Sequence, residues 1–251
     1  MYIRILLVFL LSVSFSLWAE PKKQIDLPML TSLTYYAEDY PPSVFYEGEV
    51  LRGISVRMLR AIWQELGMKA QSIEIVPWAR GYKEIISKPK TVLFAMSKTA
   101  QRADKFKWVG PIYSVDYILI AKKGKIFKAK QLSDLHSHSV AVIRHDATEQ
   151  IVLDANFAEQ QIVETNNMYQ ALAMFKADRV ELMAISRSGL RKAISEKMLQ
   201  VDDFDEVFLL DTVEDYFAFS KDVPNVVINA FQHAFDKHKR LNLALIDEFK
   251  L

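Results

Sequence analysis

The sequence predicts an α/β protein whose two halves repeat the same local order of elements. Short runs of β-branched, aromatic and aliphatic residues alternate with amphipathic helical segments, which is typical of α/β folds. In the first half, a predicted helix over residues 79–87 leads through a short basic turn to a buried strand that ends at Ser97. In the second half, a predicted helix over residues 166–175 leads to a strand that ends at Ser186. The 251 residues are sufficient for one large domain or for two lobes.

The first residues have the pattern of a secretory signal peptide. Arg4 precedes an apolar run from Ile5 to Leu11, and Ala19 is the small residue expected before a cleavage site. A membrane anchor is the alternative, but the apolar stretch is short for a bilayer core of about 30 Å. We therefore expect residues 1–19 to be removed during export.

The composition argues against several classes of protein. No cysteine is present, so disulfides, thiol chemistry and a lipid anchor on cysteine are excluded. Removing Arg4 from the 32 Lys and Arg leaves 31, equal to the 31 Asp and Glu, and this balance disfavours a nucleic-acid partner. The sequence contains no nucleophile elbow, zinc-protease motif, P-loop or dinucleotide-binding motif, and its histidines lack metal-ligand spacing. We expect no catalytic residue, no cofactor and no metal.

The first half of the mature chain begins with a strand predicted over residues 30–36 and a turn-forming loop over 37–42. Loops at strand ends are where α/β folds bind ligands. This loop is therefore a candidate ligand site. It contains Tyr40, for which packing over the loop is the alternative role, and Tyr36, Glu38 and Asp39 are weaker neighbours.

The clearest amphipathic helix is predicted over residues 53–67, and its apolar stripe is expected to face the core. A short strand over residues 73–76 and a helix over 77–86 follow. Trp78 and Arg80 come directly after that strand, so both are candidates for lining a cleft. Core packing of Trp78 and solvent exposure of Arg80 are the alternatives.

Residues 91–113 contain a candidate receptor for a small anion. An apolar strand ends at Ser97, and Thr99 has the position of an N-cap that opens a helix. Arg102 lies in the first turn of that predicted helix, where a cation is disfavoured by about 0.3–1 kcal/mol. A strand end, two hydroxyls, helix N–H groups and a guanidinium together predict a carboxylate site. A solvated basic helix face is the alternative.

The second half repeats this alternation of strands and helices. Its predicted elements are a strand over residues 139–143, a helix over 147–157 capped by Asp146, a helix capped by Asn166, a strand over 180–185, strands over 207–210 and 216–220, and a helix over 224–239. The last strands are expected to return the chain to the first half, where the final helix packs.

These stretches together resemble a known family. The segment SKTAQR, residues 97–102, followed by FKWVGP, residues 106–111, resembles the T-x-T-P-E-R…F-S-x-P-Y signature of family-3 periplasmic solute-binding proteins. These are the polar amino-acid binders of ABC uptake systems, and further partial matches extend from about Leu33 to Asp222. The resemblance implies a type II periplasmic-binding-protein fold, with two α/β lobes joined by two crossover hinge strands. Lobe 1 is then expected over residues 20–114 and 214–251, and lobe 2 over residues 115–213.

The resemblance also implies a role for each candidate residue. Arg102 would hold the carboxylate of a solute, with Thr99 and Ser97 beside it. Tyr40 matches the aromatic residue that stacks on the ligand in the family.

Three positions depart from the family pattern. Ser186 stands where the family has an aspartate that pairs with the α-ammonium of an amino acid. Arg144-His145-Asp146 replaces an R-G-T or R-G-S sequence, so a glycine and a hydroxyl are lost. Asp146 would repel a carboxylate, so it either caps its helix only or contacts a cationic part of the ligand. Arg57 stands where the family has an acid.

The resemblance implies a monomeric periplasmic protein that captures a small carboxylate-bearing solute between closing lobes and delivers it to an ABC permease in the inner membrane. An amino acid is the leading candidate for that solute. One alternative is a stand-alone sensory or scavenging receptor for a membrane signalling partner. Another is an enzyme similar to the cyclohexadienyl dehydratases, which share this fold.

Overall fold

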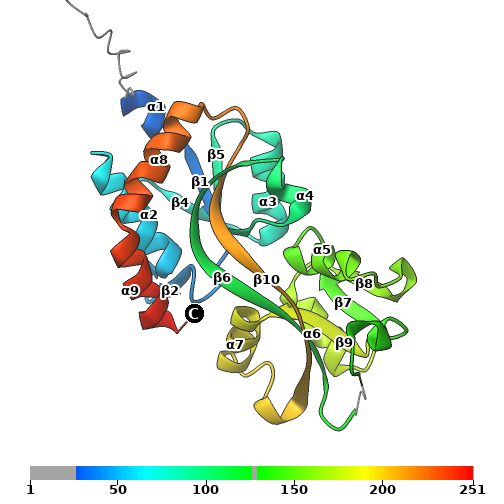
Figure 1. The fold of residues 1–251 in the computed structure, drawn as a ribbon. Helices are drawn as coiled ribbons and strands as arrows, with labels where there is room; N and C mark the ends of the chain where they lie inside the picture. Colours follow the sequence, from blue (N-terminus) through cyan, green and yellow to red (C-terminus); the bar gives the residue numbers. More distant parts are fainter. Residues whose placement is uncertain (1–26, 126–128, 251) are drawn as a thin grey trace, which may run out of the picture.

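The computed structural model describes residues 27–125 and 129–250, and they form two α/β lobes connected by two long strands (Figure 1). The predicted fold class is confirmed. The predicted signal peptide lies outside the described residues. Within them, no helix is long and apolar enough to cross a membrane.

Lobe 1 consists of the elements before the first connecting strand and after the second. They are α1 (Leu27–Thr31), β1 (Thr34–Ala37), β2 (Phe45–Glu47), β3 (Val50–Arg52), α2 (Ile54–Glu65), β4 (Ile73–Ile75), α3 (Trp78–Ser87), β5 (Thr91–Ser97), α4 (Ala100–Ala103), α8 (Asn225–Lys237) and α9 (Lys239–Phe249). Figure 1 shows α2, α8 and α9 on one side of the strands of lobe 1 and α3 on the other.

Lobe 2 consists of the elements between the connecting strands. They are η1 (Leu132–Leu135), β7 (Val140–Ile143), α5 (Ala147–Asp154), η2 (Glu159–Gln161), β8 (Ile162–Thr165), α6 (Met168–Lys176), β9 (Leu182–Ser186), α7 (Arg187–Ser195) and η3 (Val201–Asp203).

The connecting strands are β6 (Lys107–Lys122) and β10 (Phe204–Phe219), which pair antiparallel along most of their length. They join the strands of both lobes into one sheet of order β4-β1-β5-β10-β6-β9-β7-β8. The expected short strands over residues 207–210 and 216–220 are thus parts of one strand. The apolar pattern of β10 is interrupted in the sequence because residues midway along the strand are exposed between the lobes rather than buried in either core.

The two predicted lobe boundaries, between residues 114 and 115 and between 213 and 214, lie opposite each other in the β6–β10 pair. Here Ser114 pairs with Glu214 and Val115 with Val213. Register shifts interrupt the pairing on both sides of these residues. Irregular pairing of this kind bends and twists a strand locally. The position of the boundary stays a prediction.

Each half buries apolar residues from the helices that the sequence predicts. The stripe of α2 is buried as expected, with Met58, Leu59, Ile62 and Trp63 at most 2% exposed. In lobe 2, Leu172 and Phe175 of α6 pack against Met183 and Ile185 of β9 in a separate cluster. The main cluster of lobe 1 also reaches Ala147 and Ile151 of α5, so apolar contacts continue from one lobe to the other.

Several predicted elements differ in the structure. The helix expected after Thr99 is a single turn, α4, and the Thr99 side chain does not cap it. The helix expected to be capped by Asn166 begins one residue later, with the Asn167 side chain accepting from the Gln170 N–H at 2.9 Å. The helix after Asp146 ends at Asp154. The sequence interpretation missed β8, α7 and α9.

Helix α9 explains the unusual Arg57. The Arg57 guanidinium donates to both carboxylate oxygens of Glu248, at 2.8 and 2.7 Å. Both side chains are about half exposed, so this pair contributes little to stability, of the order of 0–1 kcal/mol.

Candidate ligand-binding site

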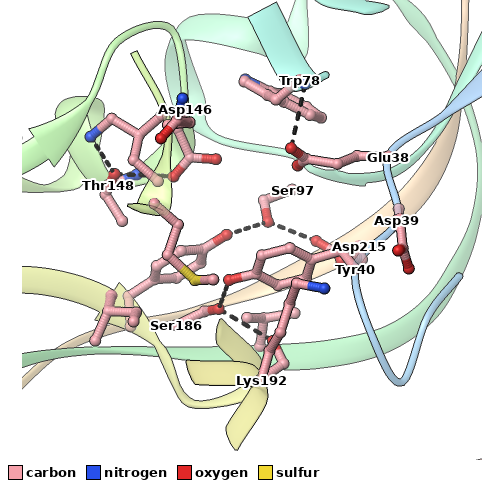
Figure 2. Close-up of a pocket in the computed structure, with 18 of the residues that line it drawn as sticks. Glu38, Asp39, Tyr40, Trp78, Ser97, Asp146, Thr148, Ser186, Lys192 and Asp215 are labelled. Carbon is pink, nitrogen blue, oxygen red and sulfur yellow. Dashed lines mark hydrogen bonds between the residues drawn. The ribbon is translucent and has the colours of Figure 1, made fainter. Parts of the chain in front are cut away.

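A cavity of about 130 Å³ lies between the two lobes, at the carboxyl ends of strands from both (Figure 2). The loop after β1 and the start of α3 contribute from lobe 1, while the starts of α5, α6 and α7 contribute from lobe 2. Such crevices at strand ends are the usual ligand sites of open α/β sheets.

The floor of the cavity is a hydrogen-bonded group around Asp215 of β10. In the sheet, Asp215 pairs with Ser97 of β5 and with Tyr113 of β6. The Ser97 hydroxyl donates to Asp215 Oδ1 at 2.5 Å and lies 2.7 Å from the Tyr117 hydroxyl. Burial raises the pKa of Asp215 to about 6, although the hydrogen bonds from Ser97 and Tyr113 oppose the rise.

A bulge in β5 shapes the same wall. Tyr216 pairs with Met96 and Phe217 pairs with Phe94, so Ala95 is the extra residue. Ala95 has a φ of 59° and lines the cavity. A bulge re-aims the side chains near it, and Ser97 follows two residues after Ala95.

Arg102 lies in the wall of the cavity and is only 4% exposed. Its Nη1 donates to the Ser97 carbonyl at 3.0 Å, and its Nη2 donates to the His145 carbonyl of lobe 2 at 2.8 Å. Its guanidinium carbon also lies 5.3 Å from the ring centroid of Trp78 and 5.4 Å from that of Tyr82. Two of its five N–H groups are thus used by backbone carbonyls. That Arg102 binds a carboxylate stays a prediction.

His145 takes the place of the expected glycine and keeps a left-handed backbone, with a φ of 59°. Histidine is among the residues that adopt this conformation more often than most. Its carbonyl accepts from Trp78 Nε1 at 2.8 Å as well as from Arg102, and its ring stacks on Tyr82. The altered loop therefore provides a contact point for lobe 1.

A second contact joins the lobes at Tyr40. Its hydroxyl lies 2.8 Å from the Ser186 hydroxyl, which accepts from the Gly189 N–H at 3.0 Å and so caps α7. A Cβ on Gly189 would lie 2.0 Å from the Tyr40 hydroxyl. Glycine at this position is therefore required for the close approach of the lobes.

Asp146 caps α5, as the first of its two predicted roles requires. Its Oδ1 accepts from the Thr148 N–H at 2.9 Å and from the Thr148 hydroxyl at 2.8 Å. The carboxylate of Glu149 accepts from the N–H of His145, the residue before the N-cap. Asp146 also lines the cavity, and its second role stays a prediction.

Glu38 is the acid of lobe 1 that faces Asp146. Its Oε1 accepts from the Trp78 N–H at 3.3 Å, at the start of α3. Burial raises the pKa of Glu38 to about 7, and the negative charge of Asp146 adds to the rise.

The structure gathers six of the eight predicted site residues in the cavity wall: Tyr40, Trp78, Ser97, Arg102, Asp146 and Ser186. Arg80 is exposed on α3 and does not line the cavity. Thr99 is buried outside the lining, and its hydroxyl has no hydrogen-bond partner.

The sequence interpretation missed Asp215, Tyr117 and Lys192. Asp215 directly precedes the strand predicted over residues 216–220, and this position at a strand end was the available signal. Among the described residues, no group of three or more His, Cys, Asp or Glu is arranged to hold a metal ion.

Residues 34–240 match the bacterial extracellular solute-binding proteins, family 3. The chain belongs to this family. No curated protein sequence matches it.

Solved structures support the fold. A histidine kinase sensor domain with similarity to periplasmic binding proteins has a TM-score of 0.74 and 19% identity, over 86% of this chain and 95% of that one. A mutant of ArgBP from T. maritima has a TM-score of 0.72 and 17% identity, over 89% and 98%. The substrate-binding protein of an amino acid ABC transporter has a TM-score of 0.68 and 15% identity, over 86% and 98%.

Proposed function

We propose that this family-3 protein captures a small solute in the cavity between its lobes, and that the solute is an amino acid or a related molecule. The observation that supports this most strongly is that both lobes line one cavity and also contact each other at its rim. A solute in this cavity would contact lobe 1 and lobe 2 at the same time.

Closure of the lobes is the proposed mechanism. Tyr40 bonds to Ser186, while Arg102 and Trp78 both donate to the His145 carbonyl. These three contacts exist only when the lobes meet, and the solute adds its own contacts to both lobes. Because a ligand shifts a conformational equilibrium only by its differential affinity, the solute must bind the closed form more tightly than the open one.

Arg102 is the proposed partner for a carboxylate of the solute. It retains three N–H groups beyond those bonded to the Ser97 and His145 carbonyls, and it lies among the rings of Trp78 and Tyr82 in a largely dry environment. A charged hydrogen bond in such surroundings is stronger than one in water. Ser97 and Tyr40 would contribute a hydroxyl and an aromatic wall.

We further propose that the protein acts in the periplasm as a monomer and delivers its solute to an ABC permease without chemical change. The amino acid transporter component among the similar structures supports this role. A sensory role is the second candidate, and the similar histidine kinase sensor domain favours it. Co-purification from membranes would distinguish the two, because a permease is expected in the first case and a signalling protein in the second.

A thermal-shift screen tests the binding function. The mature protein is incubated with amino acids, organic acids and short peptides, and its unfolding is followed. A solute at 100 times its dissociation constant stabilises the folded state by about 2.7 kcal/mol, which is a measurable shift. Absence of a shift with every compound class would contradict the proposed function.

A further inference from the structure

The charged residues in the cavity wall are not balanced. Four acids line it, Glu38, Asp39, Asp146 and Asp215, against two bases, Arg102 and Lys192. When ions are withdrawn from water, an unpaired charge costs several kcal/mol, so a closed cavity of this kind favours a compensating ligand.

Both bases already have partners within the protein. The guanidinium of Arg102 donates to two backbone carbonyls and lies near two aromatic rings. The ammonium of Lys192, a residue only 7% exposed, pairs with Glu196 at 2.8 Å. Glu196 is not part of the cavity wall, so the hydrogen-bonding partner of Lys192 lies outside it, although the charge of Lys192 also acts on Asp39 and Glu38.

The acids, in contrast, come from different lobes. Glu38 follows β1 in lobe 1, Asp146 begins α5 in lobe 2, and Asp215 lies on the strand that connects them. Figure 2 shows the Glu38 and Asp146 carboxyl groups on either side of one space, with Ser97 beneath it in that view. Among the described residues, Glu38 accepts from the Trp78 N–H and Asp146 accepts from Thr148, and neither donor carries a positive charge.

Closing the lobes therefore brings like charges together. The charge of Asp146 contributes to the raised pKa of Glu38, after the larger effect of burial, and it acts on Asp215 in the same direction. A neutral or anionic solute would leave this repulsion in place. A cationic group between the two carboxylates would replace it with attraction.

We infer that the solute carries an amine or guanidine cation in addition to any α-ammonium group, and that Glu38 of lobe 1 and Asp146 of lobe 2 hold this cation between them. This inference rests on the proposed binding function and specifies its substrate class. The aromatic residues Tyr40 and Trp78 also line the cavity, and aromatic rings are favourable neighbours for a cation.

Calorimetric titration with five probes tests the charge requirement: arginine, ornithine, agmatine, citrulline and glutamate. Citrulline matches arginine in shape but is neutral in its side chain, and agmatine keeps the guanidine group without the carboxylate. We expect at least one cationic probe to bind, and arginine to bind about tenfold or more tightly than citrulline, as for loss of a charged hydrogen-bond partner.

Two variants test whether Asp146 and Glu38 bind the cationic group of the solute. Asp146→Asn keeps a side-chain oxygen that can cap α5, so the fold is retained while the charge is lost. We expect Asp146→Asn and Glu38→Gln each to weaken binding of the cationic probe by about tenfold or more. Asp154→Asn is the matched control, because it removes an acid from the exposed end of the same helix, outside the cavity, and binding should be unchanged.

The outcomes separate this inference from the proposed function. If citrulline or glutamate binds as tightly as the cationic probes, the inference is wrong while the binding function stands. If both variants bind the cation as the wild type does, the assigned residues are wrong. If none of the five probes binds, the inference is overturned, and the wider thermal-shift screen then decides the binding function on its own.

Discussion

Arg102 combines an observed contact between the lobes with a proposed contact to the solute. It bonds to the His145 carbonyl across the lobe interface, and we propose that it also holds a solute carboxylate. Arg102→Ala should weaken binding of a carboxylate-bearing solute by about 2–5 kcal/mol, because a buried charge partner is lost. Calorimetry measures the effect, and Arg80→Ala, an exposed arginine of the neighbouring helix, is the control that should leave binding unchanged.

Comparison of two ligands distinguishes the roles of Arg102. If the guanidinium holds the carboxylate, Arg102→Ala should weaken arginine binding more than agmatine binding. Equal losses for both ligands would mean that Arg102 acts through the lobe contact alone. Unchanged affinity for every carboxylate ligand would reject the role altogether.

The buried acids predict how stability depends on pH. The pKa of Glu38 rises from 4.5 to about 7, and that of Asp215 from 3.8 to about 6. Between the ordinary and raised values the folded protein binds more protons than the unfolded chain, so these groups make stability fall as pH rises. For Asp215 this fall spans pH 3.8 to about 6, and for Glu38 pH 4.5 to about 7.

Melting temperatures of the unliganded protein between about pH 4 and pH 8 test this dependence. Asp215→Asn keeps an oxygen that can accept from Ser97 but cannot ionise, so its melting temperature should fall less over this range than that of the wild type. Asp154→Asn should behave as the wild type does. An identical fall in Asp215→Asn and wild type would show that Asp215 is not buried in its protonated form.

At the scale of elements, Gly189 allows α7 to lie close to the loop after β1, because it has no side chain. Gly189→Ala should stabilise α7 by about 1 kcal/mol through helix propensity. The same methyl group would collide with the Tyr40 hydroxyl when the lobes meet. We therefore predict opposite effects, a melting temperature that is unchanged or raised and a solute affinity that is reduced by about tenfold, as expected for strain of about 1–3 kcal/mol from overpacking.

The double variant Tyr40→Phe with Gly189→Ala is the control for the collision. Removing the hydroxyl takes away the nearest atom, so affinity should partly recover relative to Gly189→Ala alone. If Gly189→Ala binds solute as the wild type does, the two segments do not approach each other in the bound protein.

At the scale of the whole molecule, closure predicts a change in size. The contacts from Tyr40 to Ser186 and from Trp78 to His145 require the lobes to meet. Solute should therefore lower the radius of gyration measured by small-angle X-ray scattering. Trp78→Phe removes the donor to the His145 carbonyl, so it should raise the solute concentration needed for compaction. A radius of gyration that is independent of solute would contradict closure.

The alternation of strands and helices was sufficient to predict the fold class, because each half has its own apolar pattern. The α2 stripe is the clearest case, since Met58, Leu59, Ile62 and Trp63 follow helical spacing without interruption. The continuity of β10 was not predictable from pattern, because its middle residues lie between the lobes and are polar. Helix α9 was missed although Leu241, Leu245 and Phe249 recur at helical spacing; of its residues only Asn242 and Leu245 are buried.

Local sequence pattern also predicted part of the site. Tyr40, Ser97 and Ser186 lie at strand ends, which local pattern identifies. Asp215 was missed because its place in the cavity depends on pairing with strands far away in the sequence. Thr99 was wrongly expected to cap a full helix. Only the four residues of α4 follow it, and the chain then continues into β6.

The contact between Trp78 and His145 provides an intrinsic optical signal. Three tryptophans lie in the described part of the chain. Trp63 is buried in the lobe 1 core, and the Trp108 indole donates to the Ala103 carbonyl within that lobe. Trp78 alone among them donates across the lobe interface. Separation of the lobes would release its indole to water, so unlabelled protein should report opening as a red shift in emission that Trp78→Phe abolishes.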